Sequence, residues 1–207
     1  MKIKKQTIII SLGIEFLKKR KEYREYVDPE LIKLINLSGY NVYLLNNFYK
    51  GDSRLNNERY INDIIKKLNV CGIILSGGAD YGIYKYRDRT EFYLINLSIK
   101  KKIPLLGICR GLQMINFFFR GKQKKIKNHV RKINKINIDK KCLDIKCFHI
   151  NSISKIGNDL EILSKSKDNC IEAIKHKKYC IYGWMWHPER NLRYKNFFIK
   201  KFKKIFN

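Results

Sequence analysis

The chain has 207 residues, of which 45 are Lys or Arg and 18 are Asp or Glu, so its net charge is +27. With 44% hydrophobic and 13% aromatic residues it can fill a core, which excludes wholesale disorder. No apolar run reaches the roughly 18–20 residues that a membrane-spanning helix needs, and the length suits one domain or two small ones.

The basic start of the chain and the apolar run from Thr7 to Ile14 imitate a short signal peptide. A small-residue cleavage site is lacking, however, and the charged stretch 15–24 follows. We therefore expect a buried first strand and a cytoplasmic protein. Six cysteines should stay reduced in that compartment, and no Cys-x-x-Cys pair indicates a zinc knuckle or a redox dithiol.

Short apolar runs then alternate with longer amphipathic stretches. Strands are expected at residues 7–10, 41–45, 71–75 and 104–108. Helices are expected over residues 29–38, 60–68, 90–100 and 110–119, the first capped by Asp28 and ended by Gly39. Because strands buried on both faces that alternate with helices are typical of βαβ units, we predict a parallel sheet.

After about residue 128 the expected strands are shorter, and they would extend the sheet or form an antiparallel flap. They lie at residues 136–138, 143–150, 171–174 and 180–186. Residues 197–206 carry apolar side chains at helical spacing, which predicts a C-terminal helix with a solvated basic face. A nucleic-acid or lipid surface is the alternative for that face. Since lysines are spread along the whole chain, we interpret the charge as a property of the entire surface and do not expect nucleic acid.

One turn has the pattern of a nucleophile elbow, Gly107-Ile108-Cys109-Arg110-Gly111, in which a strand leads through Gly-x-Cys-x-Gly into a helix. The small flanking residues allow a sharp turn that holds the central side chain clear of the backbone. The helix N-terminus also favours the thiolate form of Cys109. The alternative is a buried structural cysteine between two packing glycines.

A nucleophilic thiol needs a base and a group that orients the base. His187 and Glu189 lie two residues apart after a strand-like run, so both side chains point to the same side. Glu189 can then fix the tautomer of the imidazole and leave its other nitrogen for Cys109. A surface pair is the alternative for an isolated His-x-Glu.

Two glycines end an expected parallel strand, in Leu75-Ser76-Gly77-Gly78. Glycines there allow a backbone N–H of Gly77 or Gly78 to face a reacting carbonyl, and the N–H of Arg110 is the natural second donor. The sequence thus predicts an oxyanion hole, with an ordinary glycine turn as the alternative.

These three pieces, in this order, resemble the class I glutamine amidotransferase family. The resemblance implies an α/β three-layer sandwich, with a mostly parallel central sheet flanked by helices and a small C-terminal antiparallel portion, as a single domain over 1–207. In that family the cysteine attacks a γ-glutamyl amide and forms a glutamyl thioester, the histidine is general base and acid, and the glutamate orients it. These roles fall on Cys109, His187 and Glu189. Gln113 matches a family position that contacts the glutamyl substrate.

The chain most resembles the γ-glutamyl hydrolase branch, the γ-glutamyl-γ-aminobutyrate hydrolase-like proteins. Residues 22–28 resemble that branch's Glu-x-Arg-Asp-x-x-Asp stretch, and residues 87–91 resemble its Arg-Asp-x-x-Glu stretch. Residues 171–173 and 181–189 match its C-terminal strands. In its size and in the first of these stretches the chain is similar to a small group that hydrolyses γ-glutamyl-CDP-amidate in the making of surface-polysaccharide phosphoramidate.

The resemblance also suggests substrate contacts. Glu22, Arg24 and Arg87 lie in the matching stretches, and Arg24, Arg87 and Arg89 are candidate contacts to an anionic group. Salt-bridged surface arginines are the alternative for these positions.

The chain departs from the branch at Cys147-Phe148-His149-Ile150-Asn151, where Ser-Tyr/Phe-His-x-Gln is usual. Asn151 is one methylene shorter than Gln, and His149 is then a substrate-pocket or a structural histidine. Cys142 and Cys147, with His149 nearby, leave a metal site open as the weaker alternative to apolar packing of the two cysteines. We therefore expect that the chain binds no metal ion.

We therefore expect a stand-alone hydrolase that uses no metal or organic cofactor. A glutaminase subunit that delivers ammonia to a separate synthase is the alternative from the same family. A catalytically inactive basic binding protein is the alternative from another class, and it predicts that a member of the triad is absent. The expected partner is a small γ-glutamyl substrate, whose phosphate the positive charge would attract. No membrane insertion is expected, and a homodimer stays open.

Overall fold

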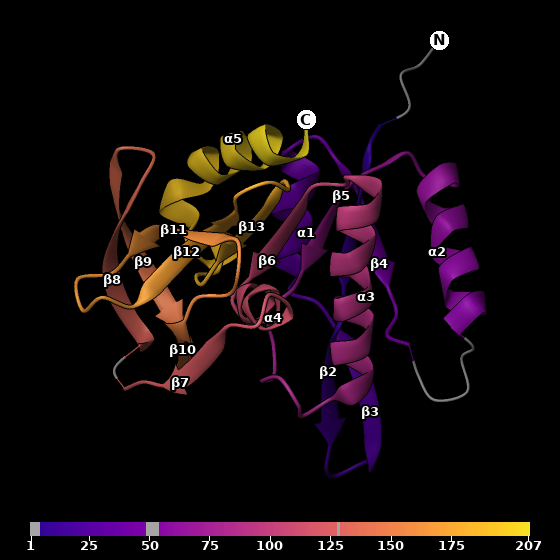
Figure 1. Cartoon of the computed structure of the whole chain (residues 1–207), viewed down its shortest axis with the longest axis horizontal. Helices are drawn as coiled ribbons and strands as arrows, with labels where there is room; N and C mark the ends of the chain where they lie inside the picture. Colours follow the sequence, from indigo (N-terminus) through magenta and orange to yellow (C-terminus); the bar gives the residue numbers. More distant parts are fainter. Residues whose placement is uncertain (1–4, 49–53, 128) are drawn as a thin grey trace.

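The computed structural model describes residues 5–48, 54–127 and 129–207, so the first four residues of the basic start lie outside the described part. A seven-stranded sheet forms its centre (Figure 1). Across the sheet the strands follow the order β11 (Leu160–Lys165), β12 (Ile171–His176), β13 (Ile181–Trp184), β6 (Leu105–Ile108), β5 (Val70–Leu75), β1 (Thr7–Ser11) and β4 (Asn41–Leu45).

Five neighbouring strands of this sheet run parallel, and the other two do not. β13, β6, β5, β1 and β4 pair in parallel, whereas β12 pairs antiparallel with β13 and with β11. The expected parallel sheet and its small C-terminal antiparallel portion are both confirmed. Of the late strands, β12 and β13 extend the sheet, because β13 pairs in parallel with β6. The strands expected at residues 136–138 and 143–150 instead lie in a separate antiparallel ribbon.

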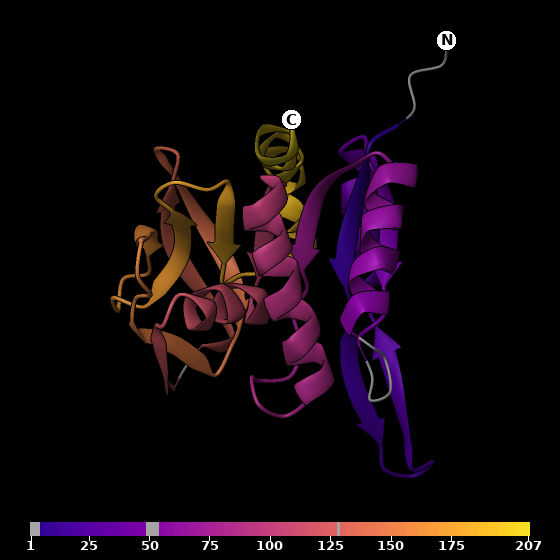
Figure 2. The same ribbon diagram turned by 45° about the vertical axis from the view of Figure 1, so that its right-hand side comes forward.

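Helices cover both faces of the sheet and complete three layers (Figures 1 and 2). α1 (Pro29–Leu37) and α5 (Lys195–Phe206) contribute to one buried core, and α2 (Arg54–Lys67), α3 (Lys85–Lys101) and α4 (Arg110–Phe118) to the other. Alternate residues of β1 divide between them: Ile8 and Ile10 belong to the first core and Ile9 to the second. This division is the period-two signature of a strand buried on both faces.

The helix ends follow the local sequence signals. Asp28 caps α1, since its Oδ1 accepts from the N–H of Glu30 at 3.1 Å, and Gly39 follows the helix with φ +101°. α5 buries Phe198 and Phe202 and leaves most of its lysines exposed, as expected of an amphipathic helix.

α3 begins at Lys85, five residues before the expected start at Thr90. Its first turns carry the charged residues Arg87, Asp88 and Glu91, which are all buried. The sequence positions where the helix begins therefore carry no apolar stripe. Because the helix was predicted from the spacing of apolar residues, its predicted start is too late.

Three two-stranded ribbons surround the sheet. They are β2 (Gly13–Leu17) with β3 (Glu22–Tyr26), β8 (Val130–Ile138) with β9 (Lys141–Phe148), and β7 (Lys122–Lys125) with β10 (Asn151–Lys155). The β2–β3 hairpin projects beyond the end of the sheet (Figures 1 and 2). It was not expected from the sequence, because β2 continues the apolar run of β1 and the turn and β3 are rich in charged residues.

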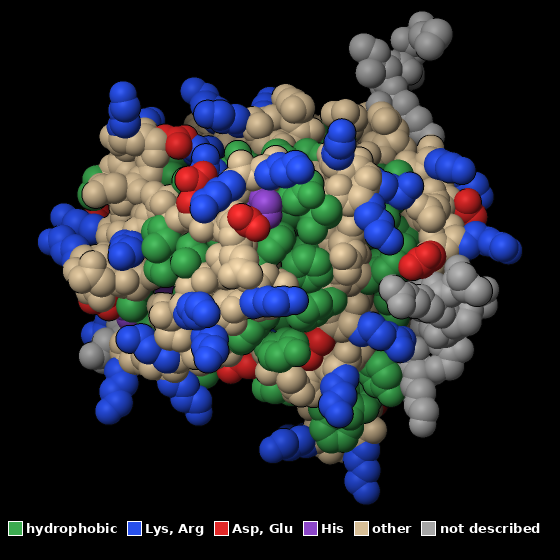
Figure 3. Space-filling view, viewed as in Figure 1, with side chains coloured by type: hydrophobic (Ala, Val, Ile, Leu, Met, Phe, Trp, Pro, Cys, Tyr) green, Lys and Arg blue, Asp and Glu red, His purple; other side chains and the backbone are tan. Residues whose placement is uncertain are grey.

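Basic side chains are spread over the surface. On the face that Figure 3 shows, Lys and Arg are distributed without a single gathered patch. Within the described residues, no helix combines the length and the apolar character needed to cross a membrane.

Candidate functional site

Cys109 lies on the turn that joins β6 to α4, with the unusual dihedrals φ 52° and ψ −104°. Its N–H donates to the carbonyl of Trp184 at 2.7 Å, which fixes the turn against β13. A Cβ at Gly107 would lie 2.5 Å from the carbonyl oxygen of Gly111, and a Cβ at Gly111 would lie 2.9 Å from the Cβ of Leu75. Both glycines are thus required by close packing, and the strained conformation between them is the one that an elbow needs.

His187 follows β13 and precedes a 3₁₀ turn, Pro188–Arg190. Its Nδ1 lies 2.6 Å from Oε1 of Glu189, and both side chains are buried. Burial lowers the pKa of His187, but hydrogen bonds with Cys109 and Glu189 outweigh it and raise the pKa to about 9. Since Nδ1 faces Glu189, Nε2 is the nitrogen left for the thiol.

The two glycines after β5 belong to a third chain segment, which lies beside the segments of Cys109 and His187. A Cβ at Gly77 would lie 2.7 Å from Cε1 of His187 and 3.7 Å from Cβ of Cys109. β13, β6 and β5 are neighbours in the sheet and run parallel, so their carboxyl ends share one edge. The thiol, the imidazole, the carboxylate and the glycine turn therefore lie close together at this edge.

A cavity of about 210 Å³ opens at this edge. It is lined by Tyr26, Val27, Asp28, Leu31, Ser76, Gly77, Gly78, Cys109, Phe148, His187, Glu189 and Arg190. A larger cavity of about 680 Å³ lies between α2 and α3. Its lining includes no cysteine or histidine, so the smaller cavity is the candidate site for acyl chemistry.

A buried ion network lies beneath the glycine turn. Nε of Arg87 pairs with Oε1 of Glu91 at 3.0 Å, and Arg110 pairs with Glu91 and Asp88. Ser11 donates to the same Oε1 of Glu91 at 2.8 Å. Burial raises the pKa of Glu91, but the charges of Arg110 and Arg87 outweigh it and lower the pKa overall.

Arg87 also fixes the peptides of the glycine turn. Its Nη2 donates to the carbonyl oxygen of Ser76 at 2.7 Å and to that of Gly77 at 2.9 Å. In a trans peptide the N–H points opposite to the C=O, and no cis peptide occurs in the described residues. The N–H groups of Gly77 and Gly78 therefore point away from Arg87.

The residues expected to contact substrate lie outside the cavity lining. Glu22 and Arg24 pair with each other on the exposed β3 strand, with Nη2 of Arg24 2.7 Å from Oε1 of Glu22. Arg87 is wholly buried and is committed to Glu91 and backbone carbonyls. Each of these two guanidinium groups therefore has a carboxylate partner from its own neighbourhood.

Gln113 and His149 are also buried away from the cavity lining. Gln113 lies on α4, its Nε2 is 3.8 Å from Sδ of Met185, and its Oε1 has no hydrogen-bond partner in the described structure. Nδ1 of His149 lies 3.0 Å from the carbonyl oxygen of Asn151. Of the expected cysteine pair with His149, Cys147 is buried beside it, whereas Cys142 is exposed at the other end of β9.

Several cavity residues were not assigned to the site from the sequence, among them Tyr26, Phe148 and Arg190. Tyr26 comes from the end of the unexpected β3 strand, and Phe148 packs edge-on against His187 with ring centroids 5.8 Å apart. Nε of Arg190 pairs with Oδ2 of Asp28 at 3.1 Å, and its guanidinium lies 4.9 Å from the centre of the Phe148 ring. For Arg190 the available signal was its position directly after His187-Pro188-Glu189.

The chain matches known proteins both in sequence and in fold. Residues 37–205 match the family model described as glutamine amidotransferase class-I. A Campylobacter jejuni protein named gamma-glutamyl-CDP-amidate hydrolase is 42% identical over 127 residues, which cover 58% of this chain. The match covers 63% of that relative's own length, less than two thirds.

One subunit of the glutamine-hydrolyzing GMP synthase of Methanococcus vannielii is 34% identical over 143 residues, covering 64% of this chain and 71% of the relative. Among solved structures, a glutamine amidotransferase from Thermotoga maritima has a TM-score of 0.64 at 17% identity, covering 95% of this chain and 85% of the other. At that identity the structural likeness shows the fold.

Proposed function

The chain belongs to the class-I glutamine amidotransferase family, and on that premise we propose that it is a cysteine hydrolase that cleaves a γ-glutamyl amide and releases glutamate. The observation that carries this proposal is the strained Cys109 turn, placed in one cavity with a His187 ring that Glu189 holds by its Nδ1. We infer that residues 1–207 act as one domain of this family and that the enzyme works in the cytoplasm.

In the first half of the reaction the Cys109 thiol gives its proton to Nε2 of His187, and its sulfur attacks the γ-carbonyl carbon. The electron pair of the carbonyl moves to its oxygen and then returns as the C–N bond breaks. His187 gives its Nε2 proton to the leaving nitrogen, so a neutral amine departs and a glutamyl thioester remains. A His187 pKa of about 9 suits this step, because the ring carries the proton at neutral pH.

Backbone N–H groups would stabilise the negative oxygen of each tetrahedral intermediate. Because Arg87 binds the carbonyls of Ser76 and Gly77, the following N–H groups, those of Gly77 and Gly78, point away from it. These two donors, with the N–H of Arg110 at the start of α4, form the proposed oxyanion hole. Each such donor lowers the barrier by about 3–4 kcal/mol in comparable enzymes.

In the second half a water molecule replaces the amine. His187 takes a proton from this water, the oxygen attacks the thioester carbon, and the C–S bond breaks to free glutamate and Cys109. Glu189 keeps the ring in the tautomer that both halves require. No step of this cycle needs a group beyond the chain and water.

The cavity volume indicates which part of the substrate the cavity encloses. About 210 Å³ is below the usual range for pockets that enclose a whole drug-sized ligand, but it accommodates an acyl group of glutamyl size. The leaving amine would then lie at the mouth, where Arg190 lines the wall. A nucleotide-linked amine such as that of γ-glutamyl-CDP-amidate brings phosphates to this position, in agreement with the name of the Campylobacter jejuni relative.

The test is a glutamate-release assay on the full chain with γ-glutamyl-CDP-amidate, simple γ-glutamyl amides and glutamine. We expect release by the wild type and a loss of at least ~10³-fold in Cys109→Ala. Mass spectrometry of the quenched reaction should find the glutamyl adduct on Cys109. Cys142→Ser, which removes an exposed thiol outside the cavity, should keep full activity.

Turnover retained by Cys109→Ala would overturn the proposal. The resemblance to the GMP synthase relative keeps one competing function, ammonia delivery to a synthase. Glutamine hydrolysis that appears only when a synthase is added, without activity on other γ-glutamyl amides, would favour that function instead.

A further inference from the structure

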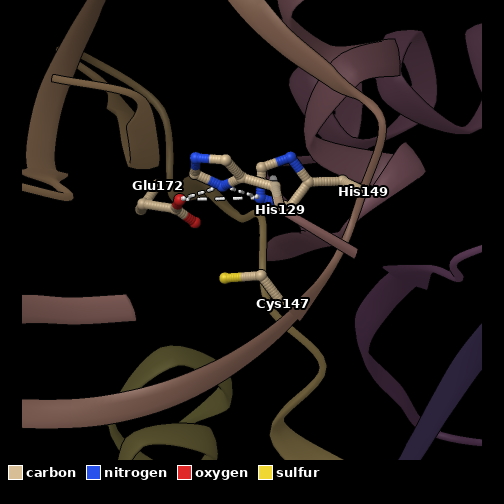
Figure 4. Close-up of side chains that lie close together, drawn as sticks. All are labelled: His129, Cys147, His149 and Glu172. Carbon is tan, nitrogen blue, oxygen red and sulfur yellow. Dashed lines mark hydrogen bonds and ion pairs between the residues drawn. The ribbon is translucent and has the colours of Figure 1, made fainter. Parts of the chain in front are cut away.

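A second cluster of reactive side chains lies apart from the Cys109 cavity. His129 directly precedes β8, and Glu172 lies on β12. Cys147 lies near the end of β9, and His149 is the first residue after that strand (Figure 4). All four are buried, and one ligand atom from each lies within 4.8 Å of the others. None of them has a role in the proposed hydrolysis.

The outer nitrogens of both rings are already occupied. Nδ1 of His149 lies 3.0 Å from the carbonyl oxygen of Asn151, which can only accept, so this nitrogen carries the proton. Nε2 of His129 lies 2.6 Å from Oδ2 of Asp168 and donates in the same way. The inner nitrogens, Nδ1 of His129 and Nε2 of His149, face each other at 3.3 Å, and in the neutral form of each ring they carry the lone pairs that a metal ion binds.

Glu172 adds negative charge to these lone pairs. Its side chain has no solvent exposure, and neither carboxylate oxygen has a hydrogen-bond partner in the described structure. Its Oε1 lies 3.6 Å from Nδ1 of His129 and 3.5 Å from Nε2 of His149, which is longer than a normal hydrogen bond. A buried carboxylate without a hydrogen bond is costly, and a cation among these atoms would stabilise it.

The spacing of these atoms suits a metal ion. Ligands about 2.0–2.1 Å from a tetrahedral zinc ion lie about 3.3–3.4 Å from one another. The three separations of 3.3, 3.5 and 3.6 Å are close to that value. We propose that His129 Nδ1, His149 Nε2, Glu172 Oε1 and Cys147 Sγ bind a structural Zn²⁺ ion.

The donor set and its surroundings agree with zinc. Two imidazoles, a thiolate and a carboxylate form a closed tetrahedral set of the kind found in structural sites. The carbonyl of Asn151 and the carboxylate of Asp168 orient the two rings as outer partners of zinc-bound histidines do. The two anionic ligands, Cys147 and Glu172, balance the charge of the ion, so the buried site is neutral.

When zinc binds, the metal ion replaces the thiol proton of Cys147. Burial and the charge of Glu172 raise the pKa of the free thiol, so it is protonated before binding, and formation of the S–Zn bond releases that proton. Asn134 must adjust, because its Nδ2 lies 2.9 Å from Nδ1 of His129 and 3.5 Å from Sγ of Cys147. It would leave the ring nitrogen and keep its bond to the sulfur.

The site would stabilise one wall of the reaction cavity. Phe148, between the ligands Cys147 and His149, lines that cavity and contacts His187. On the other side, the carbonyl of Glu172 accepts from the N–H of Met185 at 2.8 Å, just before Trp186 and His187. The ion would thus tie β9 to β12 beside the catalytic histidine without entering the reaction.

The test measures metal in the purified full chain. We expect about one Zn²⁺ per chain to survive dialysis against metal-free buffer. Co²⁺ added to the stripped protein should give the ligand-field absorption of a tetrahedral site with a thiolate-to-cobalt charge-transfer band. Cys147→Ser should lose that band, whereas Cys142→Ser, on the same strand but exposed, and Cys109→Ala should keep it.

A graded variant covers the case in which ligand variants fail to fold. Asp168 has a side chain 57% exposed and contacts only the outer nitrogen of His129 within the proposed site, so Asp168→Asn should fold and lower Zn²⁺ affinity by about 10–100-fold. A wild-type protein that binds neither metal would overturn the proposal and leave a protonated histidine as the cation. Loss of the cobalt band in Cys109→Ala or Cys142→Ser would overturn it as well.

Discussion

Glu189 holds the ring of His187 by one short hydrogen bond, 2.6 Å from Oε1 to Nδ1. Replacing Glu189 with Gln keeps the size of the side chain but removes its charge and allows the amide to favour the wrong tautomer. We expect Glu189→Gln to lower kcat by ~10²–10⁴-fold with a smaller change in KM. Steady-state glutamate release measures both constants.

A matched control is available on the sheet edge. Glu161 pairs with Lys175 at 2.7 Å on the exposed surface of β11 and β12, outside the cavity. Glu161→Gln removes the same charge and should leave kcat unchanged. Equal losses in the two variants would show that net charge, and not the orientation of His187, is responsible.

The pKa of His187 also makes a prediction about stability. Its folded pKa, about 9, lies above the ordinary value of 6.5, so the folded state holds a proton that the unfolded state releases between these values. The stabilisation is complete below about pH 6.5 and is lost as the pH rises through about 9. We expect the free energy of unfolding of the wild type to fall over this window by about 1–3 kcal/mol more than that of His187→Gln.

Urea unfolding at pH 6.5 and pH 9.5 provides the measurement. Cys109→Ser should show a smaller fall than the wild type, because the hydrogen bond with Cys109 is one of the causes that raise the pKa. A wild type and a His187→Gln variant with the same pH dependence would contradict the prediction.

At the level of elements, α3 reaches beneath the strand end of β5 through Arg87. This guanidinium holds Glu91 and the carbonyls of Ser76 and Gly77, so it is a positioning residue for the proposed oxyanion hole. Lys keeps the charge but cannot span all three groups. We expect Arg87→Lys to lower kcat by up to ~100-fold at nearly constant KM, since Arg87 does not line the cavity.

The split between kcat and KM distinguishes positioning from simple destabilisation. A variant that only unfolds more readily would yield less active protein, with the remaining folded fraction turning over normally after active-site titration of Cys109. Arg24→Lys, on the exposed pair with Glu22, should change neither constant.

The elements that the sequence predicts well carry their signals locally. Asp28 and Pro29 open α1, and the strands buried on both faces are continuous apolar runs. α3 was placed too late because its first turns carry the charged residues Arg87 and Asp88, whose burial depends partly on Arg110 of α4 and on carbonyls after β5. Partners that distant in the chain leave no periodic pattern.

Two further omissions have the same cause. β3 shows no apolar alternation, so Tyr26 could not be assigned to a cavity. His129, which completes the second cluster, was not singled out, since its neighbours Cys147, His149 and Glu172 come together only through tertiary packing.

For the whole molecule, the spread of charge predicts salt-dependent capture of an anionic substrate. A net charge of +27 produces a positive potential that added salt screens. We expect kcat/KM for γ-glutamyl-CDP-amidate to fall by ~10-fold between about 0.01 M and about 0.5 M NaCl. A γ-glutamyl amide without phosphate should change much less, and equal slopes for both substrates would contradict steering.

The convergence of the site was predictable at this scale because the fold fixes it. Once strands ending near Gly77, Cys109 and His187 are assigned to one parallel sheet, their carboxyl ends must meet at one edge. Substrate contacts were not predictable in this way. Arg190 pairs with Asp28 at the cavity, and the sequence identified Asp28 as a helix cap and as the end of a matching stretch without indicating this contact.

The projecting β2–β3 ribbon has an exposed outer end and a base that contributes Tyr26 to the reaction cavity. Its tip, residues 18–21, is solvent exposed, so an inserted tag or dye there adds chain without disturbing the cavity. The base of the ribbon is different, because Tyr26 pairs with Gly13 and its ring fills the position that a Cβ atom at residue 13 would take. Deleting one residue from this strand would reverse the facing of every side chain and turn Tyr26 outward. The ribbon therefore tolerates additions at its far end and no change of length near its base.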